Sequence, residues 1–354
     1  MTFEQARRCF PVLESIAFLN AGTFGPLARP VVEAMEAALD RDLAEGRSGR
    51  AYFEETIALR DEVRRSFASL VGVEPERVAL TGSTTDGCAI VLRGLGLEPA
   101  DEVVTTTDEH FGLLGPLGAT PAQVVVVPPD AESILAAVTP RTRLIATSQV
   151  TWTTGAALPL AELREQSGVP VLADGAQSVG AIPTDAGGLD FLTISGQKWL
   201  CGPDCTGALV VADPARVSVT SPSYFAQRRH EPNGAFDPQP DARRFEPGWW
   251  SQPTLRGMLA ALELRPEWWF EHAWAAAERC RALLAPRFEL VVPPARSTLV
   301  AFRPGEEEPE AVVARLHEAG VHVREIPGRG LVRVSCGWWT SDGDLERLVA
   351  ALDG

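Results

Sequence analysis

The chain has 354 residues, of which 47 are acidic and 32 basic, and its formal net charge is −15 at pH 7. This acidity disfavours nucleic acids and anionic membranes as partners, and no apolar run is long enough to span a bilayer or to act as a secretion signal, so we expect a cytoplasmic protein. The six cysteines are too few and too scattered for a disulfide framework, and their spacing argues against a metal site.

One count stands out among the basic residues. Lys198 is the only lysine, and the other 31 cations are arginines. Arginine can supply charge and phosphate contacts, but it cannot act as an amine nucleophile. Lys198 is therefore a candidate catalytic residue before any motif is considered.

The chain begins with helical patterns, and short apolar runs dominate its middle. Apolar residues recur at helical spacing over 30–46 and 52–72, and a short strand at 77–80 precedes a helical pattern at 84–95. Strands and helices then alternate up to residue 212. The predicted strands are 101–107, 123–127, 143–150, 170–176, 190–195 and 207–212, and the predicted helices between them are 131–138 and 158–166.

Several of these strands are almost continuously apolar, which is typical of strands buried on both faces of a sheet. Alternation of strands with helices favours right-handed crossovers and a mostly parallel sheet, so we expect an α/β fold. In such folds ligands bind at the carboxyl ends of the strands.

The pattern changes after residue 212. Residues 213–247 are rich in proline, arginine and polar residues and are expected to be irregular, and a helical stretch that allows for breaks covers 254–285. A smaller α+β segment follows from about residue 288. We therefore expect a large domain over 15–255 and a small domain that combines 256–354 with 1–14.

Polar side chains follow the ends of two neighbouring predicted strands. Asp174 stands where one strand ends, with Gln177 three residues further on. The next strand is followed by Ser195, Gln197 and Lys198. If the strands are parallel, these side chains meet at one edge of the sheet.

Two further loops belong to the same predicted edge. The segment TGSTTDG (81–87) follows a short strand and opens a helix, so Thr84 and Thr85 suit a phosphate group, although both could be plain helix caps. His110 lies in the loop after another predicted strand.

One ligand would use all of these groups, namely pyridoxal phosphate (PLP). Lys198 would bind its aldehyde as a Schiff base, and a buried carboxylate such as Asp174 would keep its pyridine nitrogen protonated. Gln177 would donate to the phenolate oxygen. The threonine turn would hold the phosphate with Ser195 beside the lysine, and His110 would lie against the ring. On its own, Asp174 could equally be a helix N-cap.

In these residues the chain resembles the fold-type-I, class V aminotransferase-like family of PLP enzymes, which includes cysteine desulfurases, selenocysteine lyases and isopenicillin N epimerase-like enzymes. The resemblance covers essentially the whole chain and implies a mostly parallel, seven-stranded type of central sheet with a smaller α+β C-terminal domain. It is carried by LNAGTFGP (19–26), STTDG (83–87), DEH (108–110), DGAQS (174–178) and SGQKW (195–199).

Within the family, several stretches look most like the L-cysteine/cystine C–S lyases. The resemblance implies that Arg333 binds the substrate carboxylate. It also implies a homodimer in which a loop of the partner completes each active site; here that loop would be 243–254, with Ser251 or Thr254 contacting the phosphate. The stretches are 84–95, 151–163, 195–203, 243–253 with 257–264, and 332–348.

Two positions depart from the family pattern. The residue before the lysine is usually histidine and is here Gln197, which can still hydrogen-bond a phosphate. An asparagine common in desulfurases is replaced by Trp152, which we place among the substrate-binding residues. Both replacements bear on ring-edge contacts and substrate preference, and neither affects the Schiff base.

The position of the cysteines separates the activities of the family. Desulfurases carry a mobile sulfur-accepting cysteine upstream of the carboxylate-binding arginine, whereas residues 318–332 contain none and Cys336 follows Arg333 on or beside a strand. We therefore expect β-elimination on cysteine, cystine or a related sulfur amino acid, with Lys198 as the general base. The alternatives are a class V aminotransferase or epimerase of a biosynthetic amino acid, desulfurase-like sulfur mobilisation, and an inactive PLP fold that serves as a binding protein.

Overall fold

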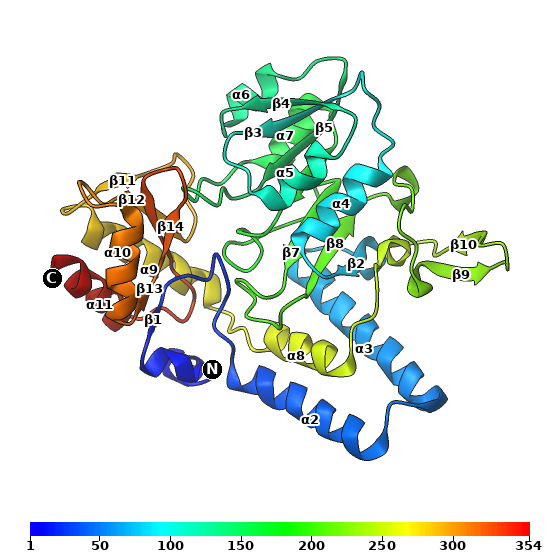
Figure 1. Ribbon diagram of the computed structural model, residues 1–354, viewed down its shortest axis with the longest axis horizontal. Coiled ribbons are helices and arrows are strands. Elements are labelled where there is room, and N and C mark those ends of the chain that lie inside the picture. The colour runs from blue at the N-terminus through cyan, green and yellow to red at the C-terminus, as the bar shows by residue number, and fades with distance from the viewer.

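The computed structural model describes residues 1–354 and is built on two main sheets (Figure 1). The larger sheet has seven strands in the order β2-β8-β7-β6-β5-β3-β4, and all neighbours are parallel except that β8 is antiparallel to both β2 and β7. The predicted mostly parallel sheet is confirmed. Its strands are β2 (Val78–Thr81), β3 (Glu102–Thr106), β4 (Gln123–Val127), β5 (Thr142–Ser148), β6 (Val171–Asp174), β7 (Phe191–Ser195) and β8 (Gly207–Val211).

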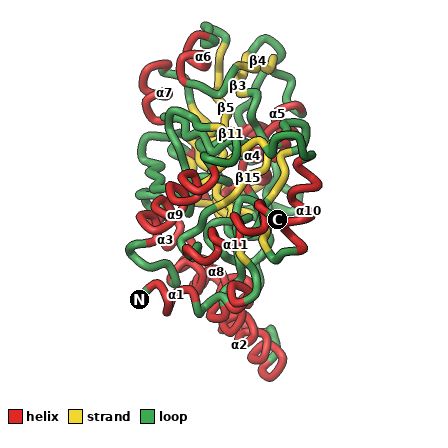
Figure 2. Tube along the Cα trace, turned by 90° about the vertical axis from the view of Figure 1, so that its left-hand side faces the viewer, coloured by secondary structure: helices red, strands yellow, loops and turns green.

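Both faces of this sheet are buried over its inner strands, as their apolar runs predicted, whereas the edge strand β4 is partly exposed, with Val126 at 55%. Successive strand residues enter different cores: Phe191 packs in a core with α4 and α5, and Leu192 packs in the core on the other face. The helices of this part are α2 (Arg29–Glu45), α3 (Gly49–Leu70), α4 (Thr84–Gly94), α5 (Phe111–Gly118), α6 (Ala131–Ala136), α7 (Leu160–Ser167) and α8 (Gln252–Glu263). Helix α8 packs against α2 and α3, and Figure 2 shows α2 projecting below the strands.

The smaller sheet is antiparallel and lies in the C-terminal part of the chain. Its order is β11-β12-β15-β14, and 17 residues form a core of their own around it. The strands are β11 (Glu289–Val291), β12 (Leu299–Arg303), β14 (Arg324–Ile326) and β15 (Leu331–Ser335). The helices at this end are α1 (Phe3–Arg7), α9 (Trp269–Leu284), α10 (Pro309–Glu318) and α11 (Asp342–Asp353).

The N-terminal segment joins the two parts. Strand β1 (Ala17–Phe18) pairs in parallel with β13 (Val321–His322), and Asn20 forms a bridge with Ser335 of β15. A two-residue strand has no periodicity, so nothing in the sequence indicated this pairing. The division at residues 15 and 255 stays a prediction.

Three local features differ from the expected elements. Residues 213–247, expected to be irregular, contain the antiparallel hairpin of β9 (Gln227–His230) and β10 (Phe236–Pro238), which projects at the right of Figure 1. Helix α5 was not expected, because its three glycines and Pro116 disfavour a helix. The stretch 254–285 is broken between α8 and α9, where Pro266 lies. None of the helices has the length and apolar character needed to span a membrane.

A buried ion-pair network holds the segment that leads into α8. The side chain of Glu246 is 1% exposed and lies between Arg60 and Arg64 of α3, with its Oε1 atom 2.6 Å from Nη2 of Arg64 and its Oε2 atom paired with Arg60. Oε1 also accepts a hydrogen bond from the Leu80 amide of β2, 3.3 Å away. One carboxylate therefore fixes a helix, a strand and a loop relative to one another.

We expect Glu246→Gln to lower the free energy of unfolding by about 3–5 kcal/mol, because Arg60 is then buried without a countercharge and Arg64 keeps only the exposed Asp61 as its partner. Glu55 is the matched control, since it also meets two arginines, Arg41 and Arg256, but with 35% of its side chain exposed. Glu55→Gln should cost less than about 1 kcal/mol. Urea unfolding followed by circular dichroism measures the free energy of unfolding of both variants. Equal decreases in the two variants would contradict this account of Glu246.

Candidate active site

The carboxyl ends of β6 and β7 lie side by side, which brings Asp174 next to the turn that carries Lys198. In the parallel register Asp174 lies opposite Thr193, whose hydroxyl is 3.5 Å from Asp174 Oδ1. The same oxygen accepts a hydrogen bond from the Ala176 amide at 2.9 Å, whereas Oδ2 has no hydrogen-bond partner. A buried carboxylate thus has one oxygen left to accept a hydrogen bond.

Lys198 lies in the turn after β7 and is partly buried. Burial lowers the pKa of its amine to about 8; the carboxylate of Asp174 opposes this shift, and the charges of Arg333 and Arg324 add to it. A substantial fraction of the amine is therefore uncharged near neutral pH, as a nucleophile or base requires.

His110 is neutral and oriented. It caps α5, and its Nδ1 atom accepts a hydrogen bond from the Gly112 amide at 3.1 Å, so the neutral ring carries its proton on Nε2. Burial lowers the pKa of His110, and the charge of Lys198 lowers it further. The ring of Trp152 meets that of His110 edge-on, with centroids 5.3 Å apart.

The threonine turn lies beside His110. Thr84 and Thr85 are the first two residues of α4, and Ser83 caps this helix by accepting a hydrogen bond from the backbone at 3.1 Å. A Cβ atom added to Gly112 would lie 2.8 Å from Thr85 Oγ1 and 3.3 Å from His110 Nδ1, so these two side chains flank the same glycine. The first amides of a helix form an anion site.

Gln177, Ser195 and Gln197 take part in contacts within the chain. The Gln177 amide group donates to the Gly22 carbonyl at 2.8 Å and accepts from the Trp199 indole at 3.0 Å, which leaves one amide hydrogen without a partner. The Ser195 hydroxyl donates to Gln197 Oε1 at 2.9 Å.

Two glycines of the N-terminal segment lie against these groups. A Cβ atom on Gly25 would overlap the Lys198 carbonyl oxygen. One on Gly22 would lie 2.5 Å from Arg333 Nη2 and 3.0 Å from Gln177 Oε1. These approaches explain the glycines of LNAGTFGP, whose structural role the sequence did not indicate.

Arg333 lies on β15 with a side chain that is nearly inaccessible to solvent. Its Nη1 atom donates to the Trp152 carbonyl at 2.5 Å, whereas Nε and Nη2 have no partner. Burial lowers the pKa of Arg333 to about 9. The indole nitrogen of Trp152 is also buried without a partner. A buried guanidinium with free donors fits an anionic ligand.

Sequence reasoning missed Arg324, which lies opposite Arg333 in the β14–β15 register. Its Nη1 atom donates to the Thr23 hydroxyl at 3.0 Å, its guanidinium is 5.8 Å from the Trp152 ring centroid, and it forms no ion pair. The available signal was a second arginine on the strand adjacent to that of Arg333.

A buried carboxylate next to His110 was also missed. Glu109 accepts hydrogen bonds from the hydroxyls of Thr106 and Thr147 at 2.6 Å each and from the Ser148 amide at 2.9 Å. Burial raises the pKa of Glu109. Glu109 therefore joins the ends of β3 and β5 beneath the loop that carries His110.

Ser251 and Thr254 are not brought to this site within one chain. The Ser251 hydroxyl caps α8 by accepting from the Thr254 amide at 3.3 Å, and the two hydroxyls are 2.9 Å apart. Neither side chain forms a hydrogen bond with Lys198 or with the threonine turn. A phosphate contact from these residues therefore remains an expectation for a partner chain.

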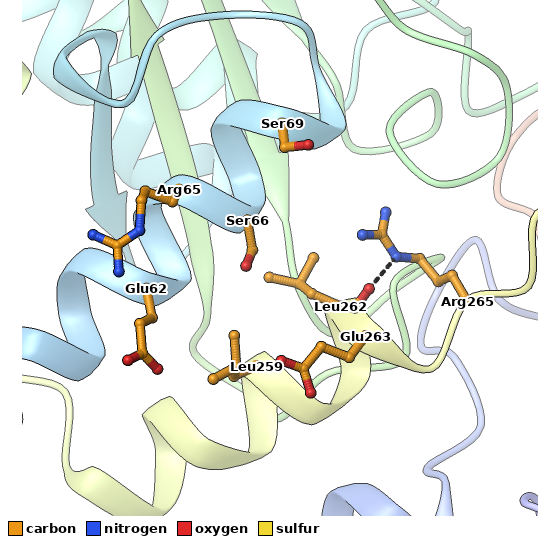
Figure 3. Close-up of a pocket in the computed structure, with 8 residues that line it drawn as sticks. All are labelled: Glu62, Arg65, Ser66, Ser69, Leu259, Leu262, Glu263 and Arg265. Atoms are coloured by element: carbon orange, nitrogen blue, oxygen red, sulfur yellow. Dashed lines mark hydrogen bonds between the residues drawn. The ribbon is translucent and has the colours of Figure 1, made fainter.

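A pocket of about 380 Å³ lies elsewhere, between α3 and α8 (Figure 3). Charges of both signs line it, from Glu62, Arg65, Glu263 and Arg265, and Arg265 donates to the Leu262 carbonyl. None of the predicted site residues lines this pocket.

The strand-end residues fit PLP. The Lys198 amine, whose pKa is lowered, suits the aldehyde of PLP, and the unbonded carboxylate oxygen of Asp174 suits its pyridine nitrogen. The start of α4, with its two threonines, suits the phosphate, and the neutral imidazole of His110 suits the face of the ring. The unbonded donors of Arg333 match the carboxylate of an amino acid.

Proteins with known activities resemble the chain over nearly its full length. It is 29% identical over 399 residues to isopenicillin N epimerase of Streptomyces clavuligerus, covering 99% of this chain and 98% of the relative. It is 26% identical over 392 residues to the cysteine desulfurase CsdA of Escherichia coli (strain K12), covering 99% and 96%.

Solved structures of the cystine C–S lyase C-DES have the same fold. Its complex with the reaction product cysteine persulfide matches with a TM-score of 0.89 at 26% identity, covering 97% of this chain and 98% of that one. A C-DES variant with glycine covalently linked to the PLP cofactor matches with a TM-score of 0.89 at 27% identity, covering 98% of both chains.

The model of the aminotransferase class-V family matches residues 16–344, which include every residue of the strand-end site. Members of this family depend on PLP. The chain belongs to the aminotransferase class-V family.

Proposed function

We propose that the protein is a PLP-dependent C–S lyase that cleaves cystine by β-elimination. The Cβ–S bond breaks, and cystine and water yield pyruvate, ammonia and cysteine persulfide. The observation that carries this proposal is the pair Arg324 and Arg333, which lie opposite each other near Lys198 and lack carboxylate partners. Cystine has two carboxylates, and the fold match to a cystine C–S lyase supports the same reaction.

PLP, when bound, withdraws electrons from the substrate and acidifies its α-proton. Lys198 Nζ would hold the cofactor aldehyde and then take the α-proton as a general base. The unbonded Oδ2 of Asp174 would accept a hydrogen bond from the pyridine nitrogen and stabilise its protonated form. The remaining amide hydrogen of Gln177 would be donated to the phenolate oxygen.

The cofactor phosphate would bind at the start of α4, through Thr84, Thr85 and the amides there. Ser195 and Gln197, which now hydrogen-bond to each other, would turn toward the same phosphate. The neutral ring of His110 would cover one face of the pyridine without adding positive charge.

The two arginines would divide the substrate between them. Arg333, with two unbonded donors, would bind the carboxylate next to the reacting carbon. Arg324 would bind the distal carboxylate of cystine, and Trp152 would lie between them with its free indole N–H. Cysteine has one carboxylate and would use only Arg333.

Transfer of sulfur to a protein thiol has less support. Residues 318–332 contain no cysteine, and Cys336 is fully buried in the core around the smaller sheet. A thiol in that position cannot approach a substrate without unfolding its surroundings.

Epimerisation is the second candidate, because the epimerase of Streptomyces clavuligerus resembles the chain over its full length. Unlike elimination, epimerisation would require a proton donor on the face of the substrate opposite Lys198. The products separate the two reactions, since epimerisation inverts Cα and releases neither pyruvate nor a sulfur compound.

The first prediction here concerns Lys198. We expect PLP uptake by the apoprotein to speed up as pH rises and to level off above about 8, because the neutral amine attacks the aldehyde. Borohydride reduction of the holoenzyme should link the cofactor to the single lysine. Lys198→Ala and the charge-matched Lys198→Arg should both lose the visible absorption of bound PLP and about a thousandfold in elimination rate. A yellow, active Lys198→Arg enzyme would refute this role.

The second prediction concerns the substrate carboxylates. Wild-type enzyme should release pyruvate and persulfide from cystine. Arg324→Ala should raise KM for cystine about 10- to 100-fold and leave KM for cysteine nearly unchanged, whereas Arg333→Ala should raise both, since each arginine contributes charge-assisted hydrogen bonds. Coupled pyruvate assays with the two substrates measure this. An Arg324→Ala enzyme whose KM rises equally for cystine and for cysteine would contradict this division of roles between the two arginines.

The third prediction concerns a homodimer. Three exposed aromatic side chains pack together near the 243–254 loop, Tyr224 (67% exposed), Trp249 (47%) and Phe53 (38%), and we propose that a second copy of the chain covers them. Sedimentation should give a dimer, and Trp249→Glu should give a monomer with weaker PLP binding. Trp274→Glu, on α9 with 41% exposure, is the control and should stay dimeric. A monomeric wild-type holoenzyme would overturn this proposal.

A further inference from the structure

The β14–β15 hairpin carries both arginines that we assign to substrate carboxylates. Arg324 begins β14, Arg333 lies within β15, and the turn 327–330 joins the strands. Because β14 is an edge strand, no further strand of the smaller sheet supports the hairpin on that side. Pairing with β12 holds the β15 side of the hairpin, so contacts of β14 and of the turn with other parts of the chain are what can fix its free side.

Three arginines of the hairpin reach the loops around the larger sheet. Arg324 donates to the Thr23 hydroxyl at 3.0 Å, and Arg333 donates to the Trp152 carbonyl at 2.5 Å. Both are also assigned to the substrate, so replacing either one would remove a proposed substrate contact together with the contact that holds the hairpin. Arg329, in the turn, is not assigned to the substrate.

Arg329 contacts the loop after β3. Its Nη2 atom donates to the Thr107 carbonyl at 2.6 Å and lies 3.0 Å from Asp108 Oδ1. The other oxygen of Asp108 accepts a hydrogen bond from the Thr153 hydroxyl at 2.6 Å. Thr153 directly follows the residue whose carbonyl binds Arg333. Asp108 thus ties the hairpin turn to the loop that also holds the substrate arginine.

The two partners differ in burial. The side chain of Asp108 is 10% exposed and that of Arg329 is 45% exposed. Removing Arg329 leaves the Asp108 carboxylate with the neutral Thr153 hydroxyl as its side-chain partner, and it removes both charge-assisted contacts between turn and loop. Since Arg329 itself lies at the surface, it can be replaced without opening a core.

We propose that Asp108 and Arg329 are positioning residues whose ion pair fixes the β14–β15 hairpin and so sets where Arg324 and Arg333 receive the two carboxylates of the substrate. This inference rests on the proposed function. The pair acts through the two arginines, so it governs substrate binding and leaves the proton transfer at Lys198 unchanged.

The kinetic test compares KM with kcat in the holoenzyme. Arg329→Ala should raise KM for cystine about tenfold, as expected for loss of a charge-assisted hydrogen bond, and leave kcat within about twofold. Asp108→Asn should do the same. Arg329→Lys should recover most of the affinity, because a single nitrogen of Arg329 makes both contacts.

The matched control is Arg287→Ala. Arg287 also donates to a backbone carbonyl and to a carboxylate, those of Leu283 and Asp353, with 35% exposure, but both partners lie in the C-terminal part of the chain. Its removal should leave KM and kcat for cystine unchanged. A rise in KM equal to that of Arg329→Ala would overturn the proposal.

Hydrogen exchange of the holoenzyme provides a readout that does not depend on activity. Amides of residues 324–335 should exchange about tenfold faster in Arg329→Ala than in the wild type or in Arg287→Ala. If wild-type enzyme fails to cleave cystine, the proposed function is wrong, but hydrogen exchange still tests whether the ion pair fixes the hairpin. Faster exchange in Arg329→Ala supports that role of the pair, and unchanged exchange overturns it. Unchanged KM in an active Arg329→Ala enzyme also overturns it.

Discussion

Although the net charge of the chain is −15, three cationic side chains lie close together with a single carboxylate to offset them at Lys198. Lys198, Arg324 and Arg333 act on one another electrostatically, and Asp174 is the carboxylate that offsets them at Lys198. Burying cations in this way is unfavourable unless anions arrive, as the lowered pKa values of Lys198 and Arg333 indicate. A phosphate and two carboxylates would supply those anions under the proposed function.

The parallel order of the larger sheet is what makes this gathering possible. The ends of β3, β5, β6 and β7 point to one edge, so side chains that are tens of residues apart in sequence become neighbours. That much could be predicted from the sequence, because Asp174 and Lys198 each follow a buried apolar strand within a few residues. The position of each strand can be recognised from its own apolar residues, and parallel pairing of the strands then places the side chains that follow them at the same edge of the sheet.

Contacts made by the smaller sheet could not be predicted in the same way. Arg324 and Asp108 contact partners more than 40 residues away. Arg324 lies in no pattern that distinguishes it from other charged residues, and the DEH motif that contains Asp108 does not indicate Arg329 or Thr153 as its partners. Strand β1 is too short to show periodicity, and the glycines and proline of α5 argued against a helix that tertiary packing nevertheless stabilises. The side chains of Ser251 and Thr254 hydrogen-bond only within this pair in one chain, at the start of α8, so a phosphate contact from them stays a prediction.

The same hairpin bears on the fate of the sulfur. A desulfurase-type mechanism needs a segment that carries a thiol toward the substrate and away again, and such a segment has to move. Here the corresponding segment is held at three points by Arg324, Arg329 and Arg333 and carries no cysteine. A hairpin held in this way suits recognition of carboxylates at a fixed spacing. Under the proposed function, sulfur would then leave with the small-molecule product, because no thiol is brought to it, and the proton transfer at Lys198 would be the same whether sulfur is transferred or released.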